Sequence, residues 1–324
     1  MAPSGQESEA SDMRDGAKAV SRSKAAAEPQ PSDWDAGSKP APKNPALRGL
    51  TLVATPIGNL DDITYRAVKL LESADLIACE DTRVTGKLLT LLGIPSKKLT
   101  PYHEHNAEKA RPALMARMRE GAAVVLVSDA GTPLVSDPGF RLVRACLEED
   151  IPVTSAPGAS ALLTALQLSG LPSDRFLFAG FLPNKDGARR SVLSELAAVP
   201  ASLIFYESPH RLEDSLAAMA ELLPGREAAV ARELTKLYEE VRRGSLVELA
   251  AHYKEAGGPK GEVVIVVSPP PEAPPPTEED LDAQLTKALE SHSPRDAAAL
   301  VAAALGLPKR TVYGRAVELA GQRR

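Results

Sequence analysis

The sequence predicts an α/β protein with two α/β domains and a small C-terminal helical domain. From about residue 48 to residue 172, short apolar runs alternate with stretches of helical periodicity, a pattern typical of a mostly parallel sheet covered by helices. Strands separated by longer intervals continue to residue 268, which favours a second α/β domain. A run of prolines then precedes a final segment of helical pattern, which we expect to fold separately.

The expected elements follow the apolar pattern in chain order. In the first domain, apolar runs predict four strands, at 50–54, 76–79, 122–128 and 153–155. Helical spacing of apolar residues predicts helices at 64–73, 107–120 and 139–149 in this domain, and one at 160–169 at the start of the second. In the second domain we expect strands at 175–180, 202–206, 228–232 and 262–267. In the tail, Ser293 and Pro294 open a helix that Gly306 ends, and a second helix follows from Lys309.

Proline placement sets the boundaries between these parts. Six of the 28 prolines lie in residues 1–46 and six more in 269–276. Because the polar first segment buries too little apolar surface to become ordered, we expect it to be disordered. The expected parts are a disordered tail at 1–46, α/β domains at 47–157 and 158–268, a proline-rich linker at 269–277, and a helix-turn-helix-like domain at 278–324.

The bulk properties exclude several classes of protein. Two cysteines are too few for a disulfide framework or a four-cysteine zinc site. No stretch reaches the ~18–20 apolar residues of a membrane span, and the first residues lack the apolar core of a secretory signal. We therefore expect a cytoplasmic protein with no membrane partner. The net charge of −5 excludes a chain dominated by a basic arm but not a local basic face.

Segment 128–139, with the sequence SDAGTPLVSDPG, is the strongest candidate for a ligand-binding loop. It joins a buried strand to a helix, and ligands of open α/β sheets bind just beyond the carboxyl ends of strands. Asp129 and Asp137 have the chemistry to bind an amine or a ribose hydroxyl, and Gly131 and Gly139 allow close backbone approach. A tight turn with polar caps is the alternative.

Segment 55–64, with the sequence TPIGNLDDIT, follows the first predicted strand and so reaches the same sheet edge. Its Pro-Ile-Gly-Asn portion, which ends at Asn59, suits close approach to a ligand. Asp61 or Asp62 is a candidate cap for the next helix. The segment is neither a dinucleotide-binding nor a phosphate-binding glycine loop.

Charged residues follow the second predicted strand. Glu80, Asp81 and Arg83 form either a structural ion pair or a contact with a phosphate or a planar base. His103 and His105 lie further along, but no third ligand has metal-site spacing, so we expect no metal.

The C-terminal segment predicts two helices joined by a tight turn, as in a helix-turn-helix. Lys309, Arg310 and Arg315 would lie on the second helix. These cations suit either contact with nucleic-acid phosphates or the solvated face of a small docking domain.

Together, segments 52–60, 80–83, 128–139 and 205–211 resemble the ribosomal RNA small subunit methyltransferase I family of the tetrapyrrole methylase superfamily. The resemblance covers about 49–268, and the tail helices fit the family's C-terminal extension. It implies two α/β domains of tetrapyrrole methylase type with the cofactor in the interdomain cleft. It also implies S-adenosylmethionine as methyl donor, 2′-O-methylation of a cytidine in 16S rRNA within the 30S subunit, and a homodimer.

Carried over residue by residue, the resemblance assigns cofactor contacts to Pro56, Asp129, Ala130, Gly131, Thr132, Pro133, Ser160, Tyr206, Arg232 and Gly261. The expected catalytic residues are Glu80, Asp81, Arg83 and Asn59. A ribose hydroxyl is a poor nucleophile and needs a proton acceptor. Asp81 and Glu80 rank ahead of Asp129 and Glu262 for that role. Asn59 and Arg83 would orient the nucleotide, with help from His105 or Lys260.

Two alternatives stay open. The same fold serves methylases that act on a carbon of a tetrapyrrole precursor, although segment 80–83 and the basic tail argue against that substrate. The second alternative is a non-catalytic RNA-binding assembly factor anchored by residues 278–324, which would not bind S-adenosylmethionine.

Overall fold

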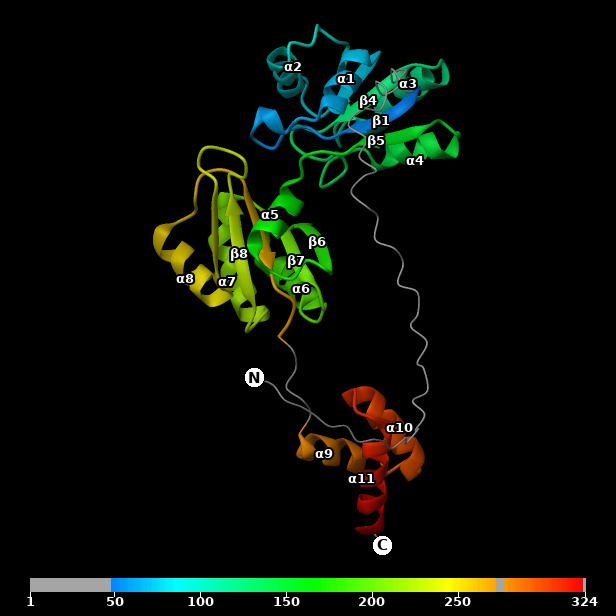
Figure 1. Ribbon diagram of the computed structural model, residues 1–324, viewed down its shortest axis with the longest axis vertical. Coiled ribbons are helices and arrows are strands. Elements are labelled where there is room, and N and C mark those ends of the chain that lie inside the picture. Colours follow the sequence, from blue (N-terminus) through cyan, green and yellow to red (C-terminus); the bar gives the residue numbers. More distant parts are fainter. Residues whose placement is uncertain (1–47, 272–276, 323–324) are drawn as a thin grey trace, which may run out of the picture. The chain divides into compact units, whose positions relative to one another are not determined.

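The computed structural model describes residues 48–271 and 277–322, so the predicted disordered tail at 1–46 and most of the predicted linker lie outside the described residues. The described chain contains two five-stranded sheets, each with its own helices, and a set of helices near the C-terminus (Figure 1).

The first sheet is wholly parallel, in the order β3-β2-β4-β1-β5. Its strands are β1 (Gly49–Val53), β2 (Leu76–Cys79), β3 (Leu99–Pro101), β4 (Ala123–Val127) and β5 (Val153–Ala156). Helices α1 (Tyr65–Ser73) and α2 (Thr82–Leu91) pack on one face, and α3 (Ala107–Arg119) and α4 (Phe140–Glu148) on the other. Every residue of β2 and β4 is buried, because a parallel sheet is covered on both faces.

The second sheet is mixed, in the order β6-β7-β10-β8-β9, and only β6 and β7 are parallel. Its strands are β6 (Phe176–Phe181), β7 (Ser202–Glu207), β8 (Glu227–Arg232), β9 (Glu240–Ser245) and β10 (Val263–Val267). Helix α5 (Ala161–Ser169) packs on one face. The other face is covered by α6 (Asp186–Leu196), α7 (Leu212–Leu222) and α8 (Leu246–Ala256).

The C-terminal helices form a separate hydrophobic cluster. They are α9 (Glu278–Ala288), α10 (Pro294–Leu305) and α11 (Lys309–Gln322). Ser293 caps α10 by accepting the Asp296 N–H, as predicted, and Gly306 ends that helix in the left-handed conformation. Arg315 pairs with Asp282 of α9 at 2.6 Å, so one cation of the predicted basic helix joins two helices together.

The predicted strands and helices are confirmed to within about two residues at their ends. The sequence pattern missed α2, which begins directly after the Asp81 cap, and β9, which has only one aliphatic residue, Val241. It also missed the short strand β3 and the helices α6, α7, α8 and α9. The capping prediction for segment 55–64 was wrong. Thr64 caps α1, while Asn59 caps the short 3₁₀ turn Leu60–Asp62 that contains both aspartates.

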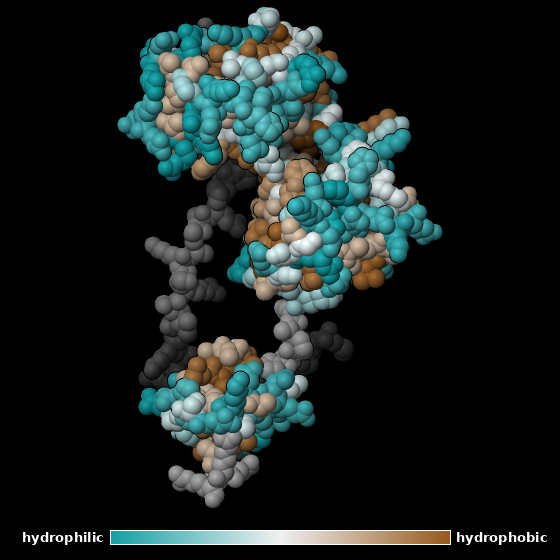
Figure 2. Space-filling view, turned by 180° about the vertical axis from the view of Figure 1, so that it is seen from behind, coloured by the Kyte–Doolittle hydropathy of each residue, from teal (hydrophilic) through white to brown (hydrophobic). Residues whose placement is uncertain are grey.

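The face drawn in Figure 2 carries no single extended apolar band. It is mainly hydrophilic, with hydrophobic side chains in separate patches. Within 48–271 and 277–322, no helix combines the length and apolar character that crossing a bilayer requires.

Replacing Gly139, which joins the 128–139 loop to α4, tests how tightly that loop is packed. Its φ is +143°, and an added Cβ would lie 2.8 Å from Leu134 and 2.9 Å from Leu126. We expect Gly139→Ala to lower the free energy of unfolding by about 1–3 kcal/mol, measured by denaturant titration. Gly187→Ala is the control, because that glycine lies in α6 with open space around it and alanine favours a helix. Equal stability of the two variants would contradict the prediction.

Candidate functional site

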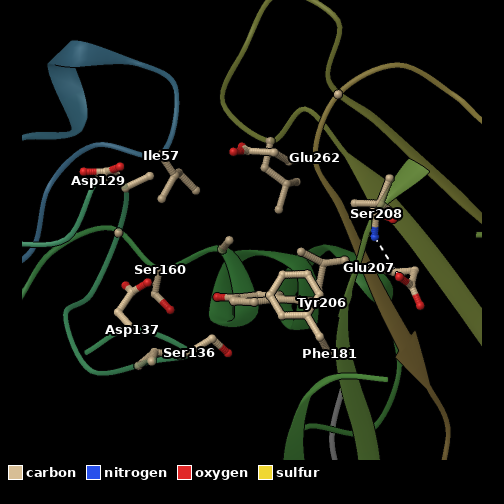
Figure 3. Close-up of a pocket in the computed structure, with 18 of the residues that line it drawn as sticks. Ile57, Asp129, Ser136, Asp137, Ser160, Phe181, Tyr206, Glu207, Ser208 and Glu262 are labelled. Carbon is tan, nitrogen blue, oxygen red and sulfur yellow. Dashed lines mark hydrogen bonds between the residues drawn. The ribbon is translucent and has the colours of Figure 1, made fainter. Parts of the chain in front are cut away.

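A cavity of about 400 Å³ lies where loops of the first sheet face strand ends of the second. Figure 3 shows Asp129, Asp137 and Ser160 on one side and Tyr206, Glu207 and Ser208 on the other. The volume suits a drug-sized ligand. The complete lining is Ile57, Asp129, Ala130, Gly131, Thr132, Val135, Ser136, Asp137, Ser160, Ala161, Phe181, Tyr206, Glu207, Ser208, Pro209, Leu234, Gly261, Glu262, Val263 and Val264.

The loops of the first sheet are bonded to one another. Thr55 and Gly131 exchange two backbone hydrogen bonds, of 2.9 and 3.1 Å, which join the loop after β1 to the loop after β4. The Thr132 hydroxyl donates to the Ala159 carbonyl at 3.1 Å and so reaches the loop after β5. The Asp129 carboxylate accepts the Asp81 N–H at 3.0 Å, which adds the loop after β2. Four strand ends are therefore fixed relative to one another.

The 128–139 loop holds an uncommon backbone conformation. Leu134 and Ser136 have φ values of 73° and 65°, and Gly131 and Gly139 are also in the positive-φ region. Side-chain-bearing residues adopt this region only where surrounding contacts determine it. Glu233 and Thr235, which flank the cavity residue Leu234, have φ values of 48° and 65°. Strained backbone thus occurs in loops of both sheets that face the cavity.

An aromatic group forms part of the wall contributed by the second sheet. Tyr206 makes edge-on contacts with Phe178 and Phe181, with ring centroids 4.8 and 5.6 Å apart. Burial raises the pKa of the Tyr206 hydroxyl, which therefore stays protonated at neutral pH. In Figure 3 this hydroxyl points toward the side of the cavity that carries Ser160 and Asp137.

The buried Glu207 carboxylate is fully engaged within its own segment. It accepts hydrogen bonds from the Ser208 N–H at 2.8 Å, the Arg211 Nε at 2.7 Å and the Ser215 hydroxyl at 2.6 Å. These contacts hold the turn after β7 in place, and Arg211 balances the charge. The charged part of segment 205–211 therefore has a structural role.

Acidic side chains concentrate at the ends of β2 and β4. Burial and the neighbouring Glu80 carboxylate raise the pKa of Asp137 to about 6, although a hydrogen bond with Ser128 works in the opposite direction. Burial and the Asp129 charge also raise the pKa of Glu80. Carboxylates that share a partly desolvated site cannot all ionise easily. The cavity thus has an acid that changes charge close to neutral pH.

Asp81 lies in a different electrostatic setting. Its carboxylate pairs with Arg83 at 2.6 Å and also accepts the Arg83 N–H as the cap of α2. Hydrogen bonds from Arg83 lower the pKa of Asp81 to about 2. The structural ion pair considered for segment 80–83 is therefore present. The Arg83 side chain is 90% exposed, so it remains accessible to a ligand.

The structure brings most of the predicted cofactor contacts to one place. Seven of the ten line the cavity: Asp129, Ala130, Gly131, Thr132, Ser160, Tyr206 and Gly261. Pro56 and Pro133 are next in sequence to lining residues, while the Arg232 side chain lines a second pocket.

The four predicted catalytic residues, Asn59, Glu80, Asp81 and Arg83, are outside the cavity lining, although Asp81 contacts Asp129. Sequence reasoning named Asp137, with Asp129, as a candidate to bind an amine or a ribose hydroxyl, but did not include it among the assigned cofactor or catalytic residues. The signal available was its position in the same strand-to-helix loop as Asp129.

Comparisons with known proteins place the chain in two described families. The family described as "Tetrapyrrole (Corrin/Porphyrin) Methylases" matches residues 49–250, and the family described as "RsmI C-terminal HTH domain" matches residues 275–320. A ribosomal RNA small subunit methyltransferase I from Mesorhizobium japonicum is 53% identical and covers 87% of this chain and 96% of its own length. The protein of that name from Erythrobacter litoralis is 58% identical, and the match covers 85% of this chain and 96% of the relative.

Solved structures share the fold at lower identity. The methyltransferase CobJ has a TM-score of 0.51 at 22% identity, covering 68% of this chain and 94% of its own. Diphthine synthase has a TM-score of 0.51 at 17% identity, and the match covers 68% of this chain and 89% of that structure's chain.

Replacing Asp137 tests its electrostatic setting. Its raised pKa means that the folded state disfavours the ionised carboxylate, so this group's contribution to stability falls as pH rises from about 4 to about 6. We expect Asp137→Asn to raise the midpoint of thermal unfolding at pH 7.5, with the difference vanishing near pH 4. Scanning calorimetry across pH measures both.

Asp81→Asn is the matched control, because we expect it to shift the midpoint of thermal unfolding in the opposite direction. The lowered pKa of Asp81 means that its ionised form stabilises the folded state at neutral pH, and that this contribution is lost as pH falls toward 2. This variant should melt at a lower temperature than the parent chain at pH 7.5. If both variants shift the midpoint in the same direction, the electrostatic assignment is incorrect.

Proposed function

The chain belongs to the tetrapyrrole methylase family, among the ribosomal RNA small subunit methyltransferase I proteins, and we propose that it methylates the ribose 2′-oxygen of a cytidine in 16S rRNA. The observation that carries the proposal is identity of 53–58% over 85–87% of the chain with relatives of that name. The similarity extends into the C-terminal helices through the matching HTH domain. A methylase of a tetrapyrrole precursor, the first alternative, has no such support along the tail.

The cavity supports S-adenosylmethionine as the methyl donor. Its wall combines apolar side chains, exposed loop backbone and carboxylates, which suit the adenosine, ribose and charged amino groups of that molecule. Asp129, Gly131, Thr132, Ser160, Tyr206 and Gly261 are the residues that would hold it. When bound, the cofactor supplies a methyl group on a positively charged sulfur, and a carboxylate-lined wall is complementary to that charge. Tight coupling among the loops favours precise positioning of both reactants.

We extend the proposal to the setting of the reaction. The substrate is taken to be 16S rRNA within the 30S subunit, which places the protein in the cytoplasm, and the active form is taken to be a homodimer. These points rest on the family relationship.

We assign proton acceptance from the ribose hydroxyl to Asp137. It lines the cavity, and its pKa of about 6 leaves it ionised yet able to take up a proton at neutral pH. Asp81 is less suited, because its pKa of about 2 makes it a weak base. Asp81 instead positions Arg83 and the start of α2, while Glu80 adjusts the basicity of Asp137 through its charge.

The reaction is tested with purified protein, labelled S-adenosylmethionine and 30S subunits from a strain that lacks the modification. We expect label on one cytidine of 16S rRNA, as a 2′-O-methyl group identified by nuclease digestion and mass spectrometry. Subunits from the parent strain, which are already methylated, are the control. Failure to label the deficient subunits would refute the proposed function.

The role of Asp137 is tested by pH–rate profiles. We expect Asp137→Asn to lower kcat by roughly 10²–10⁴-fold while cofactor affinity, measured by calorimetry, changes little. Because the Glu80 charge raises the Asp137 pKa, Glu80→Gln should move the acidic limb of the profile to lower pH. A large loss of cofactor affinity with unchanged kcat in Asp137→Asn would show that the residue binds the cofactor instead.

A further inference from the structure

A second pocket lies beside the edge strand of the second sheet, on the face covered by α8. It encloses about 570 Å³, and it shares no lining residue with the first cavity. Its wall comes from the ends of β8 and β9, from α8, and from the loops that precede β9 and β10. The complete lining is Arg232, Tyr238, Glu240, Arg242, His252, Tyr253, Ala256, Gly257, Gly258, Pro259 and Lys260.

Cations outnumber anions among these residues. Arg232, Arg242 and Lys260 are positively charged, and Glu240 is the one acid in the lining. Glu240 lies between the two arginines, with one oxygen 2.7 Å from the Arg232 Nε and the other 3.0 Å from the Arg242 Nη2. The pocket therefore keeps a net positive charge after its internal ion pairs are formed.

The arginines retain hydrogen-bonding capacity for a ligand. Each guanidinium has five N–H groups, and Glu240 engages only part of them. Arg232 also donates to the Lys260 carbonyl at 3.4 Å and Arg242 hydrogen-bonds Tyr253, which still leaves further N–H groups on each guanidinium. The Nε of Arg242 is shielded from solvent and has no hydrogen-bond partner in the described chain, which is a costly state for a buried donor. A guanidinium that is held by a carboxylate and still has further N–H groups to donate suits bidentate binding of a phosphate.

The same wall carries groups that suit a nucleobase. Tyr238 is 68% exposed although it is a large aromatic residue, and the neighbouring Leu237 is 88% exposed. The His252 and Tyr253 rings lie edge to face, 4.9 Å apart. Tyr253 itself is buried, so Tyr238 is the ring that is available to a ligand, and an exposed aromatic face beside arginines is typical of sites that stack single-stranded bases. Gly257 leaves open space at the rim, so a ligand can approach the backbone there.

The second pocket is continuous with the first cavity along the chain. Lys260 lines the second pocket, and Gly261 and Glu262 line the first. Across the sheet, Arg232 is in register with Val263, another residue of the first cavity. The two pockets therefore have neighbouring lining residues at the end of the sheet where β8 ends and β10 begins.

We propose that this second pocket is a subsite for single-stranded RNA, in which Arg242 and Lys260 hold a phosphate and Tyr238 stacks on the base of a nucleotide next to the methylated one. The inference rests on the proposed function, because it takes the reacting nucleotide to lie in the first cavity. It adds a specific contact that sets the affinity for the RNA and leaves the chemical step and the cofactor site unchanged.

The first test compares Arg242→Gln with the full-length parent chain on 30S subunits that lack the modification. We expect KM for the subunits to rise roughly tenfold, kcat to stay within twofold, and cofactor affinity to remain unchanged. The slope of log(kcat/KM) against log salt should become shallower by about 0.7 for each phosphate that the variant no longer binds. Arg117→Gln is the matched control, because Arg117 is also partly exposed and paired with a nearby glutamate, Glu120, at the end of α3.

Tyr238 and Glu240 give variants with further distinct outcomes. Tyr238→Ala should raise KM several-fold, and Tyr238→Phe should restore it, because stacking needs the ring and not the hydroxyl. Glu240→Gln should leave KM unchanged or lower it, because it removes the acid that competes with phosphate for both arginines. If Arg242→Gln and Glu240→Gln both lower the melting temperature and kcat but not the salt slope, the cluster is purely structural and the proposal fails.

Direct binding separates this inference from the proposed function. Fluorescence anisotropy with a labelled single-stranded oligonucleotide from 16S rRNA does not depend on methyl transfer. Parent chain that binds the oligonucleotide several-fold more tightly than Arg242→Gln supports the subsite even if no methylation is seen. Normal methylation by Arg242→Gln, with unchanged KM and unchanged oligonucleotide affinity, would overturn the subsite while leaving the methyltransferase proposal intact.

Discussion

The pair of backbone hydrogen bonds between Thr55 and Gly131 is the contact on which the first cavity depends. It joins two loops that leave neighbouring parallel strands, and it leaves their side chains free to face the cavity. The Asp129 and Thr132 side chains then attach the loops after β2 and β5 to the same centre. A group of short loops would otherwise lose much conformational entropy on binding a ligand, and here the fold has already ordered them.

The acidic residues around the first cavity differ in whether an arginine is paired with them. Asp81 and Glu207 are each bonded to an arginine of their own segment, and they stabilise turns. Asp129 and Asp137 face the cavity without an ion-paired arginine in the described chain, and burial together with the Glu80 charge raises the pKa of Asp137. Residues of one chemical type therefore differ in electrostatic setting according to whether a cation lies within hydrogen-bonding distance.

The sequence predicted the strands well, because a fully buried strand such as β4 has an unbroken apolar run. It predicted the loop that carries Asp129 for the same reason, since the end of such a strand fixes where a loop must begin. It could not predict that Arg232 points away from the first cavity. Side chains of a strand alternate between the two faces of the sheet. Arg232 therefore lies on the same face as Val230, which is covered by α8, and Ala231 lies on the other face. Edge strand β9, which pairs with the preceding strand β8, was missed because its pattern is charged and lacks an apolar run.

The carboxylates of the first cavity also determine what is kept out of it. A phosphodiester that approached Asp129 and Asp137, which have no ion-paired cation in the described chain, would meet repulsion at short range in a partly desolvated space, where screening by salt is weak. A neutral ribose or base meets no such barrier. The acidic wall thus opposes binding of a strand with a phosphate in the cavity. It opposes entry of the charged group of a nucleic acid, the phosphate, and so restricts the register in which a strand can be held.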